Sequence, residues 1–516
     1  MTDPPAKLLQ SLSNRLYQLV DDDPLEAITQ ARGLRASNEL SEEEVDGLRA
    51  AILVDAGGDL RDEAAVAEGV AQFRSLVDRF PGRLDLRYNL ANGLSALAHR
   101  DTTRGWDWYR ATGRMRREAR SLYSSVAHDT SGRLASRAFA NLGNLLQQSF
   151  RLLEAHDAYM ASVTEDPSNS VAWSGAAKVL RTFADWRIGS VQHLEEIVEA
   201  YLVRAEKTVP AEAPGQRRAR RAIEEMKTNS HLAPKLPDLR DTEPYVRWVA
   251  EKRLSLSPTI VGLPPDIKRW DTLTITSITE DLSAPNGVPP IFALFNTLKA
   301  DYIVARWLAY RALEEPPEET GYYADTLDYA NYGAAPSALT LAHRATIDIL
   351  DRIAVAASHY FALPGSVRDI YFLGRWHVAK GGKLAEPLEW QQLVADQVAS
   401  GNLGILALTE IAEDIASGGS LAGQRSLRHS TTHRFVVLHD MLIDARTSEH
   451  VERWRDAEFR SVTVEALQIV RAALFYFLQA INISEHRKKT SSTGLILPLV
   501  VPPHHWIRGE DAETAH

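Results

Sequence analysis

The sequence predicts an all-α protein in which a block of helical repeats is followed by a helical bundle. Apolar residues recur with helical spacing along most of the 516 residues, whereas stretches with an extended pattern are confined to positions 272–279 and 495–502. Nine of the 24 prolines lie between Pro234 and Pro290. Because proline removes a backbone donor and stops a helix, we expect a connection there between two helical blocks.

These boundaries divide the chain into three predicted parts. Residues 1–230 are expected to form the repeat domain, residues 231–290 the proline-rich connecting segment, and residues 291–510 the bundle.

The first block contains a repeated pattern of small, aromatic and proline residues. In the better copy, Gly143 and Ala155 allow two antiparallel helices to approach, Tyr159 fills the groove between them, and Pro167 ends the second helix. Trp173 follows Phe139 at the 34-residue spacing of a tetratricopeptide (TPR) repeat. An earlier copy has the same phase, with Phe73, Pro81, Leu90, Ala91 and Leu94. The block therefore resembles TPR repeats, whose concave face binds a peptide or protein. An irregular helical bundle is the alternative.

The second block reads as five amphipathic helices. Apolar periodicity predicts them at residues 294–313, 336–363, 403–416, 426–442 and 462–483. Gly418 and Gly419 are expected to close the third of these helices.

The composition limits the function classes. There are 58 basic and 68 acidic residues, a net charge of −10, so a chain coated with nucleic acid is not expected, and any polyanion is expected to bind at a local basic site. The chain has no cysteine, which excludes disulfides, thiolate-ligated zinc and cysteine nucleophiles. Neither an uninterrupted apolar run of membrane-spanning length nor a secretory signal pattern is visible, so we expect a cytoplasmic protein with no membrane partner.

The sequence lacks the common catalytic signatures. The patterns GxxxxGK[ST], GxGxxG after a strand, HExxH and GxSxG are missing, which argues against P-loop kinases, dinucleotide dehydrogenases, zincins and α/β hydrolases. The carboxylates are scattered rather than grouped as in a two-metal nuclease. We therefore expect no cofactor and no metal site.

The densest group of arginines and histidines is RSLRHSTTHRFVVLH at residues 425–439. On a helix, Arg428 and His433 would lie about 7.5 Å and about 140° apart, within reach of one phosphate. A histidine can move the proton of a ribose 2′-OH or of the leaving 5′-oxygen, and a guanidinium can neutralise the charge that develops on phosphorus. The pair therefore suits metal-free RNA cleavage.

Arg434 and His439 have the same spacing. Four apolar residues separate them, so we expect this second pair to serve packing rather than chemistry. The spacing alone is common, and a solvated arginine with a surface histidine is the simpler interpretation of either pair.

The segment LRHSTTHRF and its surroundings resemble HEPN domains (higher eukaryotes and prokaryotes nucleotide-binding). The similar segments before it are YVRWVAEKRLSLSPTI, DTLTI and LFNTLKADYIVARWLAY, and the one after it is EALQIVRAALFYFLQAINI. The similarity runs from about residue 242 to 505. Within the family, the chain looks like a subfamily whose members carry N-terminal TPR repeats. The family motif, R-[polar]-x3-5-H, implies catalytic roles for Arg428 and His433 and an orienting role for His429. The resemblance also implies a homodimer with two motifs facing one composite site.

The leading interpretation is a TPR–HEPN endoribonuclease, a toxin or an antiviral or stress effector, with Arg425 and Arg434 binding RNA beside the catalytic residues. One alternative is a non-catalytic RNA- or protein-binding scaffold with a degenerate HEPN bundle. Another is a partner of a nucleotidyltransferase, because HEPN domains often occur beside such enzymes.

Overall fold

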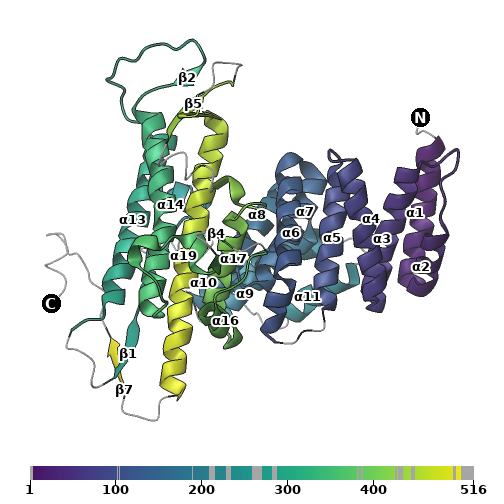
Figure 1. The fold of residues 1–516 in the computed structure, drawn as a ribbon, viewed down its shortest axis with the longest axis horizontal. Coiled ribbons are helices and arrows are strands. Elements are labelled where there is room, and N and C mark those ends of the chain that lie inside the picture. The colour runs from purple at the N-terminus through teal and green to yellow at the C-terminus, as the bar shows by residue number, and fades with distance from the viewer. Residues whose placement is uncertain are drawn as a thin grey trace.

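The computed structural model describes most of the chain. The described residues are 4–101, 103, 105–186, 188, 190–208, 216–227, 234–236, 238–257, 270–281, 287–380, 383–384, 387–424, 427, 434–442, 448–491 and 496–500. As predicted, the fold is mainly α-helical, and a row of helices leads into a bundle of three long helices (Figure 1).

The first block is a row of antiparallel helices. It comprises α1 (Pro4–Asp22), α2 (Pro24–Gly33), α3 (Glu42–Leu60), α4 (Glu63–Arg79), α5 (Leu84–Arg100), α6 (Asp107–Asp129), α7 (Gly132–Gln148), α8 (Leu152–Glu165), α9 (Ser170–Asp185), α10 (Val191–Thr208) and α11 (Gln216–Lys227). Side-chain caps start several of them: Ser41 and Glu44 form a capping box at α3, and Asn169 accepts a bond from the backbone N–H of Ala172 at α9.

The predicted repeat packing is present in α7–α9. Tyr159 of α8 is fully buried, and a Cβ atom added to Gly143 of α7 would lie 2.7 Å from its ring. Gly175 of α9 has the same ring against it. The chain turns after Glu165, just before Pro167. Glycine is required where the Tyr159 ring lies against the backbones of α7 and α9, which confirms the roles expected of Gly143 and Tyr159.

The second block is built around three long helices, α13 (Pro290–Leu313), α14 (Ala334–Tyr360) and α19 (Asp456–Ser491). Shorter elements surround them: α12 (Pro244–Glu251), η1 (Val367–Asp369), α15 (Phe372–Arg375), α16 (Gln392–Ala399), α17 (Leu403–Ile415), and the hairpin of β3 (Ala379–Lys380) and β4 (Lys383–Leu384). The predicted helices at 294–313, 336–363, 403–416 and 462–483 correspond to α13, α14, α17 and α19.

Two small sheets cap opposite ends of the long helices (Figure 1). At one end, β1 (Ser277–Asp281) pairs antiparallel with β7 (Ile496–Val500), so the two segments predicted to be extended pair with each other. At the other end, β2 (Ala330–Asn331), β5 (Phe435–His439) and β6 (Val451–Arg455) form a sheet of order β2-β5-β6. Strands β5 and β6 are parallel.

The helix predicted at residues 426–442 is therefore wrong over Phe435–His439. Phe435, Val436 and Val437 favour extended backbone, and β5 is held by pairing on both sides with strands distant in sequence. The apolar run also does not lie entirely against the bundle, because the Phe435 side chain is 74% exposed.

Helix α19 is the central helix of the bundle. Over Asp456–Thr490 it is long and apolar enough to cross a membrane by length and composition alone, yet 78% of that apolar window is buried inside the protein. A core helix of a globular bundle has the same properties.

One hydrophobic cluster spans the boundary between the two blocks. A single cluster of buried residues extends from Ala140 of α7 through Trp173 of α9 to Ile481 of α19. The connecting segment packs into it through Trp248, Leu254 and other residues. Removing residues 1–230 would therefore expose apolar surface of the bundle, and a cut there does not separate two independent cores.

Candidate functional site

Most of the predicted site residues lie outside the described part of the chain. Arg425, Arg428, His429 and His433 belong to this group, and Arg434 is the first described residue after them, exposed immediately before β5. The residues on both sides of this segment are described, and they show where it is attached to the bundle.

On the N-terminal side, Gln424 is 2% exposed and holds three elements together. Its amide nitrogen donates to the carbonyl of Val462 at 3.1 Å and to Glu465 at 2.8 Å, both on α19. Its amide oxygen lies 3.1 Å from Nε2 of His343 on α14. Because the amide nitrogen is fully used, Nε2 of His343 must carry the proton and donate to the amide oxygen. Three residues further along the chain, Leu427 is fully buried.

The electrostatics of this anchor favour a neutral histidine. Burial lowers the pKa of His343 to about 4, and the bond to Gln424 opposes this shift. Burial also raises the pKa of Glu465. The segment before Arg428 is thus attached to the core through uncharged imidazole and amide groups and one carboxyl group.

Acidification is expected to loosen this anchor. Since the pKa of His343 is below its unfolded value of 6.5, the unfolded chain binds the proton first, and stability falls as the pH drops from about 6.5 towards 4. At about 1.4 kcal/mol per pKa unit, the loss between pH 7 and pH 4 is about 3 kcal/mol. This loss of unfolding free energy is measured by urea unfolding of the wild type and of His343→Gln. The glutamine retains a donor for Gln424 but does not titrate. An equal pH dependence in both proteins would refute the assignment.

On the C-terminal side, the segment leads into the sheet. Leu438 of β5 and Leu427 belong to one buried cluster with Leu339 of α14 and Phe459 of α19. Both ends of the segment that contains Arg428 and His433 are therefore packed at the same end of the bundle, where α14 begins and α19 begins.

His439 occupies a fixed structural position. It is 1% exposed, and Arg453 of β6 donates from Nε to its Nε2 at 3.1 Å and from Nη2 to the carboxylate of Asp328 at 2.8 Å. Arg434 precedes β5 and is exposed, so the packing role predicted for the second R-x4-H pair does not hold for Arg434. The pair also lacks the helical geometry on which its spacing argument depended.

A buried charge network joins the repeat block to α17, the helix that precedes the predicted motif. Arg120 of α6 donates to Asp414 at 2.9 Å and to Glu410 at 2.9 Å. Arg116 of α6 pairs with Glu410, and Arg151 pairs with Asp414. All five side chains are at most 2% exposed.

The sequence did not reveal this network, because its partners are about 260 to 300 residues apart. A local signal was nevertheless present: Glu410 and Asp414 are acids four positions apart in a helix whose other residues, apart from Thr409 and Glu413, are apolar or glycine, and Arg116 and Arg120 have the same spacing. Buried carboxylates at helical spacing need buried cations beside them, because an unpaired buried charge is strongly destabilising.

Asp414 also directs the chain towards the motif. Its backbone carbonyl accepts a bond from the N–H of Leu421 at 2.8 Å, and a Cβ atom on Gly419 would collide with that carbonyl. Gly418 has a φ of +76°. The two glycines thus let the chain fold back over the end of α17, as predicted, and Gln424 follows three residues after Leu421.

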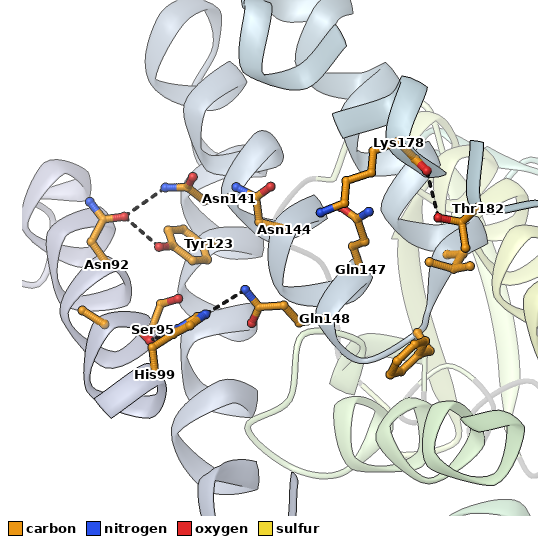
Figure 2. A pocket seen from close by; sticks show the side chains of 13 residues that line it. Asn92, Ser95, His99, Tyr123, Asn141, Asn144, Gln147, Gln148, Lys178 and Thr182 are labelled. Atoms are coloured by element: carbon orange, nitrogen blue, oxygen red, sulfur yellow. Dashed lines mark hydrogen bonds between the residues drawn. The ribbon is translucent and has the colours of Figure 1, made fainter. Parts of the chain in front are cut away.

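Residues of α5, α6, α7 and α9, with Phe150 and Leu152, line a polar groove of about 780 Å³ in the repeat block (Figure 2). Asn92 accepts bonds from Tyr123 at 2.7 Å and from Asn141 at 3.0 Å, while Gln148 lies 3.0 Å from His99. The lining residues include five amide side chains, one lysine and no carboxylate: Asn92, Ser95, Ala96, His99, Tyr123, Asn141, Asn144, Gln147, Gln148, Phe150, Leu152, Lys178 and Thr182. Such a surface can donate and accept hydrogen bonds along an extended polar ligand.

The aromatic residues at the start of α6 are part of the packing between blocks. Trp106 and Tyr109 stack with ring centroids 5.9 Å apart, and the Arg116 guanidinium lies 5.0 Å from the rings of both Trp108 and Tyr109. Trp106 also covers Gly401, just before α17.

Among the described residues, no group of three or more potential ligands could hold a metal ion.

Comparison with known proteins yields one match. Residues 282–484 match the family model described as LA2681-like HEPN. This range includes α13, α14, α17 and most of α19, and it contains the positions of Arg428 and His433. No curated protein and no solved structure matches the chain significantly. The C-terminal bundle is thus similar to HEPN domains, and the TPR assignment of the first block remains a prediction.

Proposed function

Because the range matched by the HEPN model contains Arg428 and His433, we propose that the protein is a metal-independent endoribonuclease. The match is the observation that supports the proposal. The packing of Gln424, Leu427 and β5 on the bundle supports it further, since a catalytic segment needs fixed ends.

In this proposal, the ribose 2′-OH attacks the adjacent phosphorus in line, and the bond from phosphorus to the 5′-oxygen breaks. His433 accepts the 2′-OH proton or donates a proton to the leaving 5′-oxygen. Arg428 neutralises the charge on the phosphoryl oxygens, and His429 orients the pair. The products are a 2′,3′-cyclic phosphate and a free 5′-OH. Arg425 and Arg434 bind the RNA backbone on either side.

We propose that the active form is a homodimer in which two motifs face one composite site. The polar groove of the repeat block binds a peptide or protein that regulates cleavage. We assign the protein to the cytoplasm, as a toxin or as an antiviral or stress effector.

Cleavage is expected to persist in EDTA, because the proposed acid–base groups belong to the protein. The direct experiment incubates the purified full-length protein with total RNA, with and without EDTA, and follows the fragments on a denaturing gel. Loss of cleavage in EDTA that Mg²⁺ or Mn²⁺ restores would assign the chemistry to a metal ion. RNA binding without cleavage under every condition would favour the non-catalytic scaffold.

A further inference from the structure

The turn between α7 and α8 has one side in the groove and the other in the buried charge network. Gln147, Gln148 and Phe150 line the groove. Ser149 and Arg151, at alternate positions, are at most 1% exposed and enter the network instead. Five consecutive residues therefore contact both the proposed partner site and the ion pairs that hold α17.

The turn is held in one shape. Phe150 has a φ of +59°, in the left-handed region that residues other than glycine rarely adopt, and its ring packs against both Trp106 and Tyr109. The Tyr109 hydroxyl donates to the backbone carbonyl of Gln148 at 3.0 Å, and the Arg151 N–H donates to the carbonyl of Leu146 at 2.9 Å. A group pressing on Phe150 from the groove must move this whole turn.

The network side of the turn leads to α17 by direct contacts. Arg116 donates to the Ser149 hydroxyl at 2.8 Å and also pairs with Glu410. Arg151 pairs with Asp414, whose backbone carbonyl holds Leu421. Since buried ion pairs tolerate little displacement, movement of Ser149 and Arg151 changes the packing of α17.

We infer that the groove is the site of a regulatory peptide, whose backbone the five amide side chains of the lining bind, and that residues 147–151 transmit its occupancy to α17 and to residues 421–424, which lead towards the predicted motif. The inference rests on the proposed function for its effect on RNA cleavage. It adds the route: a groove ligand that contacts Gln148 and Phe150 displaces the turn and, through Ser149 and Arg151, the ion pairs that hold α17.

The absence of cysteine from the chain makes a site-specific test possible. Ser95→Cys in the groove, labelled with a bulky maleimide in the folded full-length protein, fills the site without an identified ligand. Thr182→Cys provides a second attachment point in the same groove. Ser75→Cys, on the exposed surface of α4 outside the groove lining, is the matched control.

Hydrogen exchange of residues 403–424 is the first readout, and it does not depend on RNA cleavage. Labelled Ser95→Cys is expected to change amide exchange in this stretch about fivefold or more, whereas labelled Ser75→Cys leaves it unchanged. Adding Phe150→Gly, which keeps the left-handed backbone but removes the ring, is expected to abolish the response.

Cleavage of RNA is the second readout, and the two together separate the hypotheses. Altered exchange in a protein that never cleaves RNA supports the transmission and contradicts the proposed nuclease. Unchanged exchange of residues 403–424 after labelling at both Ser95→Cys and Thr182→Cys overturns the inference, whether or not the protein cleaves RNA. So does an undiminished response in the Phe150→Gly background.

Discussion

Replacing His433 by alanine is expected to lower the rate of RNA cleavage at least about 10²-fold, because the substitution removes the group that we propose moves the proton in the displacement. Arg428→Ala is expected to cost a similar factor, since the charge on the phosphoryl oxygens then has no fixed cation. Initial rates on one defined RNA measure both effects. Unfolding temperature and mass by light scattering should remain those of the wild type.

Two variants control for loss of charge near the site. Arg434→Ala is expected to weaken RNA binding while cleavage at saturating RNA remains close to that of the wild type. His450, 79% exposed at its side chain, provides a surface-histidine control. If His433→Ala cleaved as fast as His450→Ala, the catalytic assignment of His433 would be wrong.

Replacing Asp414 by alanine is expected to destabilise the folded protein by about 3–5 kcal/mol, because it leaves Arg120 and Arg151 buried without their shared carboxylate. These two arginines lower the pKa of Asp414 even though burial alone would raise it. The carboxylate therefore contributes its stability above the unfolded pKa of about 4 and loses it as the pH falls further. Urea unfolding at pH 7 measures the loss.

Glu68→Ala is the matched control for Asp414→Ala. Glu68 pairs with Arg32 at 2.7 Å, but both side chains are more than one third exposed, so its loss is expected to cost less than about 1 kcal/mol. A comparable loss in the two variants would contradict the role we assign to the buried network.

The parts of the fold that follow from local spacing were predictable from the sequence. Gly143, Tyr159 and Pro167 lie within 25 positions, and their packing depends on two adjacent helices. The apolar periodicity of α13, α14, α17 and α19 likewise needs only one helix at a time.

The parts that depend on distant partners were not predictable in the same way. Strand β5 exists because β6 and β2 pair with it, and no feature within residues 435–439 identifies those partners. The pairing of Arg151 with Asp414 spans more than 260 positions, and their spacing says nothing about contact. Of the candidate site, the sequence provided the motif residues, and the structure provided the anchors at Gln424, Leu427 and β5.

The central claim is that RNA is cleaved by attack of its own 2′-OH. The most direct test uses a short RNA with a mapped cleavage position and a second copy with a single 2′-deoxy substitution at the nucleotide 5′ to the scissile phosphate. Mass spectrometry of the products is expected to show a 2′,3′-cyclic phosphate and a 5′-OH from the first and no cleavage at that position in the second. Cleavage of the 2′-deoxy substrate at the same position, or a product with a 5′-phosphate, would contradict the account.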